Sequence, residues 1–191
     1  MAMIGLKVPE EICERLAKIS VPGKKISPEE MHITMFYFED KLKIKAVVNI
    51  VQAMYEVTKK FDEIPIKGNV ISTFKKGDDG VPIIIPILSE DLLNIRNKMA
   101  KKFDETDIKY SKKWPEFKPH LTLAYSPKEM EDKKLEKNIS WKASEVVLWA
   151  GEWQSNPGIL VSMPLHLSKK ASKFDNNYLV ATLFESLTRL S

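Results

Sequence analysis

The stretch "MHITMFYF", residues 31–38, is the part of the chain from which the fold is best worked out. It is rich in β-branched and aromatic residues, a composition typical of a β-strand. Side chains two residues apart point to the same face of a strand, so His32 and Thr34 share one face. Ile33 and Met35 share the other face, and we expect them to pack into a core.

A second stretch, "HLTLAYS" at residues 120–126, repeats the pattern of the first. In both stretches an apolar residue, a threonine and a second apolar residue follow a histidine, and a tyrosine lies five positions after it. His120 and Thr122 therefore share a strand face as well. The chain has only three histidines and seven threonines, so two such pairs by chance are improbable. We expect the two faces to oppose each other across a cleft.

The rest of the chain predicts helices mixed with strands and local hairpins. Apolar residues recur with helical spacing in three segments, 9–19, 43–62 and 89–105. Further strands are expected at 3–8, 64–74, 81–87, 141–153 and 158–167, with the last two forming a hairpin. The charged segment 127–138 reads as a linker. This order favours antiparallel sheets in an α+β arrangement.

The two halves of the chain share one organisation, in which a helix and strands surround a strand marked by histidine and threonine. No Gly/Ser-rich linker separates the halves. We therefore predict a single two-lobed domain over residues 1–165. Residues 166–191 are expected to form a C-terminal extension that is helical from about Asn177.

Composition and charge exclude several classes of protein for this chain. The chain of 191 residues is 43% hydrophobic and 29% charged, with a formal net charge of +4. This charge permits an anionic substrate but does not predict stable binding to duplex nucleic acid. No stretch is apolar for long enough to span a membrane, and the start does not resemble a secretory signal. The single cysteine, Cys13, is expected to be a packed side chain, and a cytoplasmic location fits.

Two histidines that face one site suit phosphoryl chemistry. Histidine titrates near neutral pH, so one neutral and one protonated imidazole can serve as base and acid. Threonine hydroxyls beside them can donate hydrogen bonds to the charge that develops on phosphate oxygens. We predict no metal site and no cofactor, because these histidines have no carboxylates at ligand spacing. The third histidine, His166, lacks the threonine and is expected to be structural or exposed.

With both motifs in place, the sequence resembles the 2H phosphoesterases, the ligase-T-like superfamily of RNA 2′,3′-cyclic phosphodiesterases. The two His-x-Thr motifs that name this family correspond to "HITM" at 32–35 and "HLTL" at 120–123. The resemblance covers roughly residues 3–165. The segment "VPGKKISPEEMHITMFYFED", residues 21–40, is similar to phage-encoded members. Some of those members resemble enzymes that destroy the cyclic oligonucleotide signals of bacterial immunity.

The resemblance implies a bilobal, pseudo-twofold α+β fold, with two antiparallel sheets flanking a central cleft and helices outside. It implies metal-independent cleavage, with His32 and His120 as the acid–base pair and Thr34 and Thr122 as phosphate donors. Which histidine is the base stays open. If the protein is phage-encoded, it would act in the host cytoplasm.

Several other side chains are weaker candidates for the site. Three aromatic residues precede the second motif and could stack a base: Tyr110, Trp114 and Phe117. Lys118 could help to hold phosphate. Trp149 and Trp153 are expected in the core or at the rim.

Two other functions stay open at this level. The same cleft could sequester nucleotides without cutting them, or the chain could be an interaction protein that assembles through its C-terminal helix. The expected partner is a nucleotide or oligonucleotide. Candidate substrates are cyclic oligonucleotides, 2′–5′ oligoadenylates and RNA or nucleotides that end in a 2′,3′-cyclic phosphate. The oligomeric state is not predicted.

Overall fold

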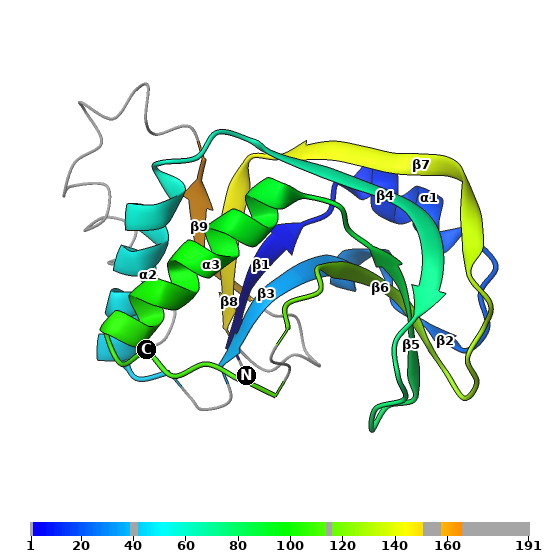
Figure 1. Ribbon diagram of the computed structural model, residues 1–191, viewed down its shortest axis with the longest axis horizontal. Helices are drawn as coiled ribbons and strands as arrows, with labels where there is room; N and C mark the ends of the chain where they lie inside the picture. The colour runs from blue at the N-terminus through cyan, green and yellow to red at the C-terminus, as the bar shows by residue number, and fades with distance from the viewer. Residues whose placement is uncertain (1, 39–41, 114–115, 151–157, 166–191) are drawn as a thin grey trace.

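A computed structural model describes residues 2–38, 42–113, 116–150 and 158–165 (Figure 1). Its strands form a continuous antiparallel sheet in the order β7-β4-β5-β6-β3-β1-β8-β9. Their bounds are β1 Ala2–Lys7, β3 His32–Phe38, β4 Ile64–Thr73, β5 Val81–Pro86, β6 His120–Ser126, β7 Lys133–Ala143, β8 Glu145–Ala150 and β9 Gly158–Pro164. The predicted α+β fold with antiparallel strands is confirmed.

The two halves of the sheet meet at the motif strands. β3 and β6 are joined through one residue pair, Ile33 with Leu121. On one side of this junction lie β1, β8 and β9, and on the other side lie β5, β4 and β7. The two sheets that the sequence predicts are thus linked into one path.

The helices pack across this junction. The helices are α1 Glu10–Ala17, α2 Ile44–Thr58 and α3 Glu90–Glu105. α3 follows β5 in the chain but packs against β3, where Phe103 contacts Phe36 at 4.9 Å between ring centroids. α1 follows β1 but reaches the other half, where the Arg15 guanidinium donates to the Asn138 carbonyl of β7. Figure 1 shows α2 and α3 together at one end and α1 near β7 at the other.

The apolar faces that the sequence indicates are buried. On α2 the side chains of Val47, Ile50, Val51, Met54 and Val57 are all less than 5% exposed. Ser89 caps α3 by accepting a hydrogen bond from the Leu92 amide at 3.2 Å. Cys13 is buried as expected, and its burial raises the pKa of the thiol to about 11.

One expected linker is instead a strand. The prediction of a linker over 127–138 is wrong from Lys133 onward, where β7 begins and pairs with β4. β7 lies at the end of the sheet and buries only Leu135, Ile139 and Ala143, so most of its side chains are polar. A largely solvated edge strand carries charges that resemble those of a linker. The expected strand 141–153 is also divided, because β7 ends at Ala143 and β8 begins at Glu145.

A short strand lies in a segment that reads as a loop. β2, Lys24–Lys25, pairs with β6 outside the main path of the sheet, with Lys24 opposite Tyr125. Gly23 precedes it with φ +91°, a conformation that glycine adopts without a steric penalty. A 3₁₀ turn at Pro28–Glu30 then leads into β3. None of the described helices is long and apolar enough to cross a membrane.

Candidate active site

The side chains of β3 and β6 divide into a core face and an opposite face. Ile33 and Leu121 are paired across the two strands, and both are fully buried. Their neighbours along each strand must point the other way. His32, Thr34, His120 and Thr122 therefore share the opposite face and are half-buried there. We call this surface the motif face.

The register of the pair sets how the four side chains are arranged. Continuing it by one residue in each direction puts His32 opposite Thr122 and Thr34 opposite His120. The two histidines are then diagonal neighbours, a relation in which Cα atoms are about 7–8 Å apart. A phosphate group can be contacted from both sides at this spacing. The sequence predicted that the two His-x-Thr faces oppose each other across a cleft, and the structure places both motifs side by side on one face of two adjacent strands.

Each imidazole is held by the backbone in the same way. The Nδ1 atom of His32 lies 2.6 Å from the carbonyl oxygen of Glu30, and that of His120 lies 2.7 Å from the carbonyl oxygen of Lys118. A carbonyl only accepts, so Nδ1 carries the hydrogen in both rings. The Nε2 atoms are left as the proton-accepting nitrogens. This matched pair of bonds fixes both tautomers and both ring orientations.

Burial lowers the pKa of both histidines below the ordinary value for imidazole. The backbone carbonyl bonds oppose this shift without cancelling it. The charge that His120 carries when it is protonated lowers the pKa of His32 further, so the two rings are close enough to interact. Both imidazoles are therefore neutral at pH 7, and a proton on one disfavours a proton on the other.

A β-bulge follows the threonine in each motif strand. In the β1–β3 pairing the register shifts between Ile4 and Gly5, which leaves Met35 as the extra residue. In the β5–β6 pairing it shifts between Ile83 and Ile84, which leaves Leu123 as the extra residue. An extra residue changes which face the following side chains occupy. The two strands consequently show the same order of buried and half-buried positions along their length.

These bulges return a tyrosine to the motif face in each strand. Tyr37 and Tyr125 are half-buried and lie five positions after His32 and His120. The Thr34 hydroxyl donates to the Tyr37 hydroxyl at 3.2 Å. Burial raises the pKa of Tyr125, and nearby Tyr37 adds to the shift. Strict alternation along the strand would have pointed both tyrosines away, which is why the sequence did not single them out as site residues. Their shared position after each histidine was the available signal.

An aromatic ring flanks each imidazole. Trp149 of β8 lies 6.2 Å from His32 between ring centroids. Phe74, directly after β4, lies 4.7 Å from His120 in an edge-to-face arrangement. Trp149 was expected in the core or at the rim, and it is buried in a small cluster with Met3 and Val147. Phe74 was not identified from the sequence, where it is one apolar residue before a charged turn.

The weaker candidates lie in different places. Tyr110 packs edge-on against Phe36, on the core side of β3, and is therefore separated from the motif face by the strand. Phe117 and Lys118 line a cavity that adjoins His120. The Lys118 side chain also forms an ion pair with Glu116 at 3.1 Å. Trp114, Trp153 and His166 lie outside the described residues, as does the C-terminal extension 166–191.

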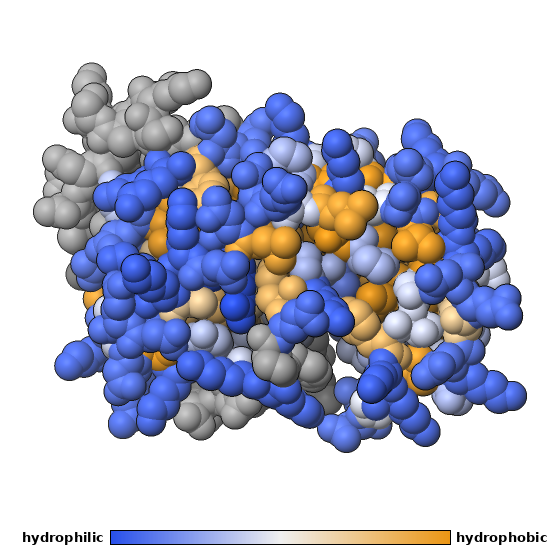
Figure 2. All heavy atoms as spheres, in the orientation of Figure 1, coloured by the Kyte–Doolittle hydropathy of each residue, from blue (hydrophilic) through white to orange (hydrophobic). Residues whose placement is uncertain are grey.

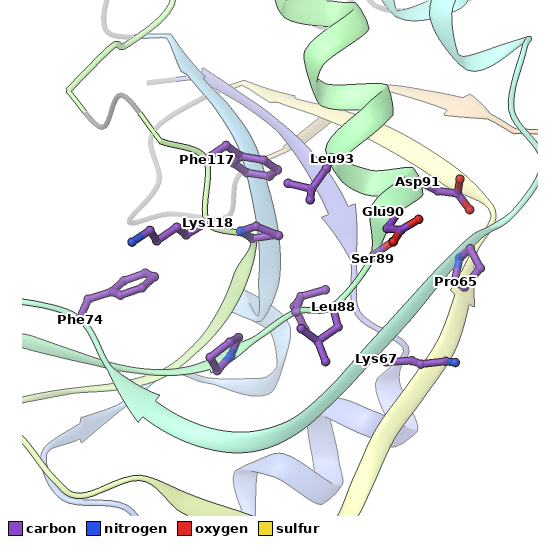
Figure 3. Close-up of a pocket in the computed structure, with 13 residues that line it drawn as sticks. Pro65, Lys67, Phe74, Leu88, Ser89, Glu90, Asp91, Leu93, Phe117 and Lys118 are labelled. Carbon is purple, nitrogen blue, oxygen red and sulfur yellow. The ribbon is translucent and has the colours of Figure 1, made fainter.

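The cavity beside His120 has a volume of about 740 Å³. It is lined by Pro65, Lys67, Phe74, Pro86, Ile87, Leu88, Ser89, Glu90, Asp91, Leu93, Phe117, Lys118 and Pro119. Figure 3 shows the leucine and phenylalanine side chains around one space, at the start of α3. Apolar side chains gather between α3 and β4 on this side of the molecule (Figure 2). Over the described ranges, no three side chains of His, Cys, Asp or Glu are grouped so that they could hold a metal ion.

Comparison with known families assigns the chain to one of them. Residues 8–152 match the model of the 2′-5′ RNA ligase superfamily, so most of the chain is covered. The chain belongs to the 2′-5′ RNA ligase superfamily. This is the family that the two His-x-Thr motifs indicated. The comparison with curated proteins found no match.

Solved structures share the fold. The protein TT0787 of Thermus thermophilus has a TM-score of 0.71 and 14% identity, over 86% of this chain and 97% of that one. E. coli LigT complexed with ATP has a TM-score of 0.63 and 15% identity, over 86% of this chain and 96% of LigT. E. coli LigT complexed with 3′-AMP has a TM-score of 0.59 and 15% identity, over 86% of this chain and 94% of LigT.

Proposed function

We propose that the chain is a metal-independent phosphodiesterase that cleaves RNA-type phosphodiester bonds, with His32 and His120 as its acid–base pair. The observation that carries this proposal is the matched pair of imidazoles on the motif face. Each is held through Nδ1 by a backbone carbonyl, which makes Nε2 the nitrogen that would accept a proton. The threonine opposite each histidine supplies a hydroxyl donor at the same place.

The proposed reaction uses a hydroxyl of the substrate as the nucleophile. One neutral imidazole takes the proton of a ribose 2′-hydroxyl through Nε2 while the oxygen forms a bond to phosphorus. The bond from phosphorus to the 5′-oxygen breaks, and the other imidazole, in its protonated form, gives its proton to that oxygen. Holding the neighbouring hydroxyl near phosphorus removes much of the entropic barrier. The product carries a 2′,3′-cyclic phosphate, which water opens with the two histidine roles exchanged.

Charge grows on the non-bridging phosphate oxygens as this step proceeds. Thr34 and Thr122 donate hydrogen bonds to these oxygens from the two strands. In the structure the Thr34 hydroxyl donates to the Tyr37 hydroxyl, so the two hydroxyls exchange roles when Thr34 donates to the phosphate. When Tyr37 donates to the Thr34 oxygen, the threonine hydrogen turns to the phosphate, and the threonine becomes a better donor.

The class of substrate is a nucleotide with a ribose hydroxyl beside the scissile phosphodiester. Structures of E. coli LigT with ATP, NADP+ and 3′-AMP show that a protein of this fold holds nucleotides. Within this class, we propose cyclic oligonucleotide immune signals first, because of the resemblance to phage-encoded members. Oligonucleotides with 2′–5′ linkages offer the 3′-hydroxyl as the neighbouring nucleophile, and a 2′,3′-cyclic phosphate is a substrate for the second step, in which water attacks.

A matched pair of substrates tests the proposal. Cyclic and linear oligonucleotides with ribose at the cleaved position are incubated with the protein in EDTA, beside partners that are 2′-deoxy there. We expect cleavage of the ribose substrate only, with a 2′,3′-cyclic phosphate detected by mass spectrometry. Equal cleavage of the deoxy partner would show that water attacks directly. Loss of activity in EDTA with recovery on adding a divalent ion would contradict the metal-independent mechanism, and binding without any product would indicate a sequestering protein.

A further inference from the structure

We propose that the cavity beside His120 is the site for a nucleobase of the substrate, and we call it the Leu88 cavity after its most exposed apolar residue. This inference rests on the proposed function, because it names the part of the nucleotide that this cavity receives. It does not involve the weaker aromatic candidate Tyr110, which packs on the core side of β3.

The apolar lining is the first observation. Leu88 and Leu93 are the exposed large hydrophobic side chains among the described residues, with 62% and 38% of their surface accessible. Both line the Leu88 cavity. Phe74 and Phe117 also line it and are half-buried. Exposed apolar side chains that gather in one hollow usually mark a binding surface. Flat aromatic ligands stack on side chains of this kind.

None of the four motif side chains lines the cavity, but two of its walls reach His120. Phe74 forms one wall and contacts the His120 ring. Pro86 forms another wall and is paired with His120 across β5 and β6. Lys118, whose carbonyl holds His120, lies at the same edge. A nucleotide whose phosphate contacts His120 therefore has its base within reach of the cavity. The volume of about 740 Å³ falls in the range of small-molecule sites and exceeds what one base needs.

The carboxylates at the start of α3 favour a base over a phosphate at that part of the cavity, although Lys67 and Lys118 also line it. A helix N-terminus ordinarily attracts anions. Here the first turn of α3 carries Glu90 and Asp91, and both line the cavity. Their carboxylates repel a phosphate and accept hydrogen bonds from N–H groups. A nucleobase has apolar faces for the leucine and phenylalanine side chains and N–H donors at its edge for these carboxylates. Figure 3 shows both acidic residues where α3 begins, on the side of the helix away from Leu93 and Phe117.

The test separates the base from the phosphate. Kinetics are measured with adenosine 2′,3′-cyclic phosphate and with 1-O-methylribose 2′,3′-cyclic phosphate, which has no base. In the double variant Leu88→Ser/Leu93→Ser we expect KM for the adenosine substrate to rise about tenfold, on the scale of lost contacts to one base. Kinetics with the base-free substrate should not change. The single variant Leu88→Trp keeps an apolar side chain at this position and should retain a low KM for the adenosine substrate.

The control variant is Asn94→Ser, which changes an exposed side chain of α3 next to Leu93 that does not line the cavity. Its KM values should equal those of the wild type. An equal effect of the double variant on both substrates, or no effect on either, would overturn the base site while leaving the phosphodiesterase activity established.

A binding measurement keeps the two proposals distinguishable if no activity is found. Calorimetric titration compares adenosine 2′-monophosphate with ribose 2-phosphate, on the wild type and on the double variant. Tighter binding of the adenosine compound that is lost in the double variant supports the base site without any turnover. Equal binding of the two compounds by the wild type, or no binding of either, would overturn it.

Discussion

The pair of histidines is distinguished by how each ring is held as well as by its neighbours. A backbone carbonyl two residues earlier accepts from Nδ1 in both His32 and His120. Burial lowers the pKa of both rings at the same time. A histidine in this setting is neutral, oriented and able to accept a proton, which suits a general base. A bound phosphate anion would favour the protonated form of the histidine that acts as the acid.

At the residue scale, we predict that His32→Ala and His120→Ala each reduce kcat at least about 10²-fold, the scale of a lost general acid or base. Substrate binding should largely persist, and the double variant should be much less than multiplicatively worse, since the pair acts as a unit. The measurement is single-turnover cleavage of a ribose oligonucleotide. His166→Gln is the control and should retain the wild-type rate. A fully active His120→Ala protein would show that the motif has another role.

At the scale of elements, the two bulges determine which side chains the motif strands present. Without them Tyr37 and Tyr125 would point away from His32 and His120. Each bulge lies between a motif strand and its neighbour, β1 for β3 and β5 for β6. The shape of the site therefore depends on strands that carry none of its histidines.

Gly5 lies at the bulge between β1 and β3 and tests this dependence. A Cβ there would collide with the carbonyl oxygen of Ile33 and lie 3.3 Å from the Cα atom of Thr34. We predict that Gly5→Ala lowers the free energy of unfolding by about 1–3 kcal/mol, the usual range for overpacking. It should also reduce kcat by about tenfold or more, because the shift of Thr34 misplaces a phosphate donor.

The matched control is Gly77→Ala, in a turn where the nearest atom to a new Cβ is the Gly80 oxygen at 3.9 Å. That variant should be near wild type in both urea unfolding and kcat. If Gly5→Ala behaves like its control, the backbone spacing between β1 and β3 is less constrained than the structure indicates.

At the scale of the whole molecule, the site forms where two half-sheets join. The junction between β3 and β6 has one bridging residue pair, and α1 and α3 each reach across it to contact the opposite half. The core on both sides of the junction is one continuous cluster of buried side chains. The histidines consequently depend on the fold as a unit, and their ionisation is coupled to global stability.

This coupling predicts how stability changes with pH. The unfolded chain binds a proton on each histidine near the ordinary pKa of about 6.5, while the folded pKa of each is lower. The contribution of the two histidines to the free energy of unfolding is therefore fully present above about pH 6.5. It is lost as the pH falls through their pKa values in the folded protein. For each histidine, the free energy of unfolding changes by at most about 1.4 kcal/mol per pH unit.

Urea unfolding between pH 5 and 7.5 measures this effect when the wild type is compared with His32→Gln/His120→Gln. The wild type should lose more stability on acidification than the variant, and their difference should stay constant above neutral pH. Parallel curves over the whole range would mean that the folded protein does not disfavour protonation of these histidines.

The sequence by itself determined the motif strands and the apolar faces of the helices. These features follow from local periodicity, since a strand alternates every residue and α2 repeats its buried face over successive turns. β6 begins and ends where the sequence predicted it, at His120 and Ser126. The family also followed from these residues, because the acid–base pair and its donors are encoded in short, contiguous motifs.

Only the tertiary structure decided which other side chains lie beside the histidines and threonines of the two motifs. Tyr37 and Tyr125 reach the motif face because a neighbouring strand forces a bulge, and no property of their own segment specifies that register. Phe74 lies beside His120 although β5 separates β4 from β6 in the sheet. β7 is a strand because β4 offers it hydrogen-bonding groups, although its own residues are mostly charged. In each case the deciding contact joins residues far apart in the chain, and local pattern does not record which partner a strand will find.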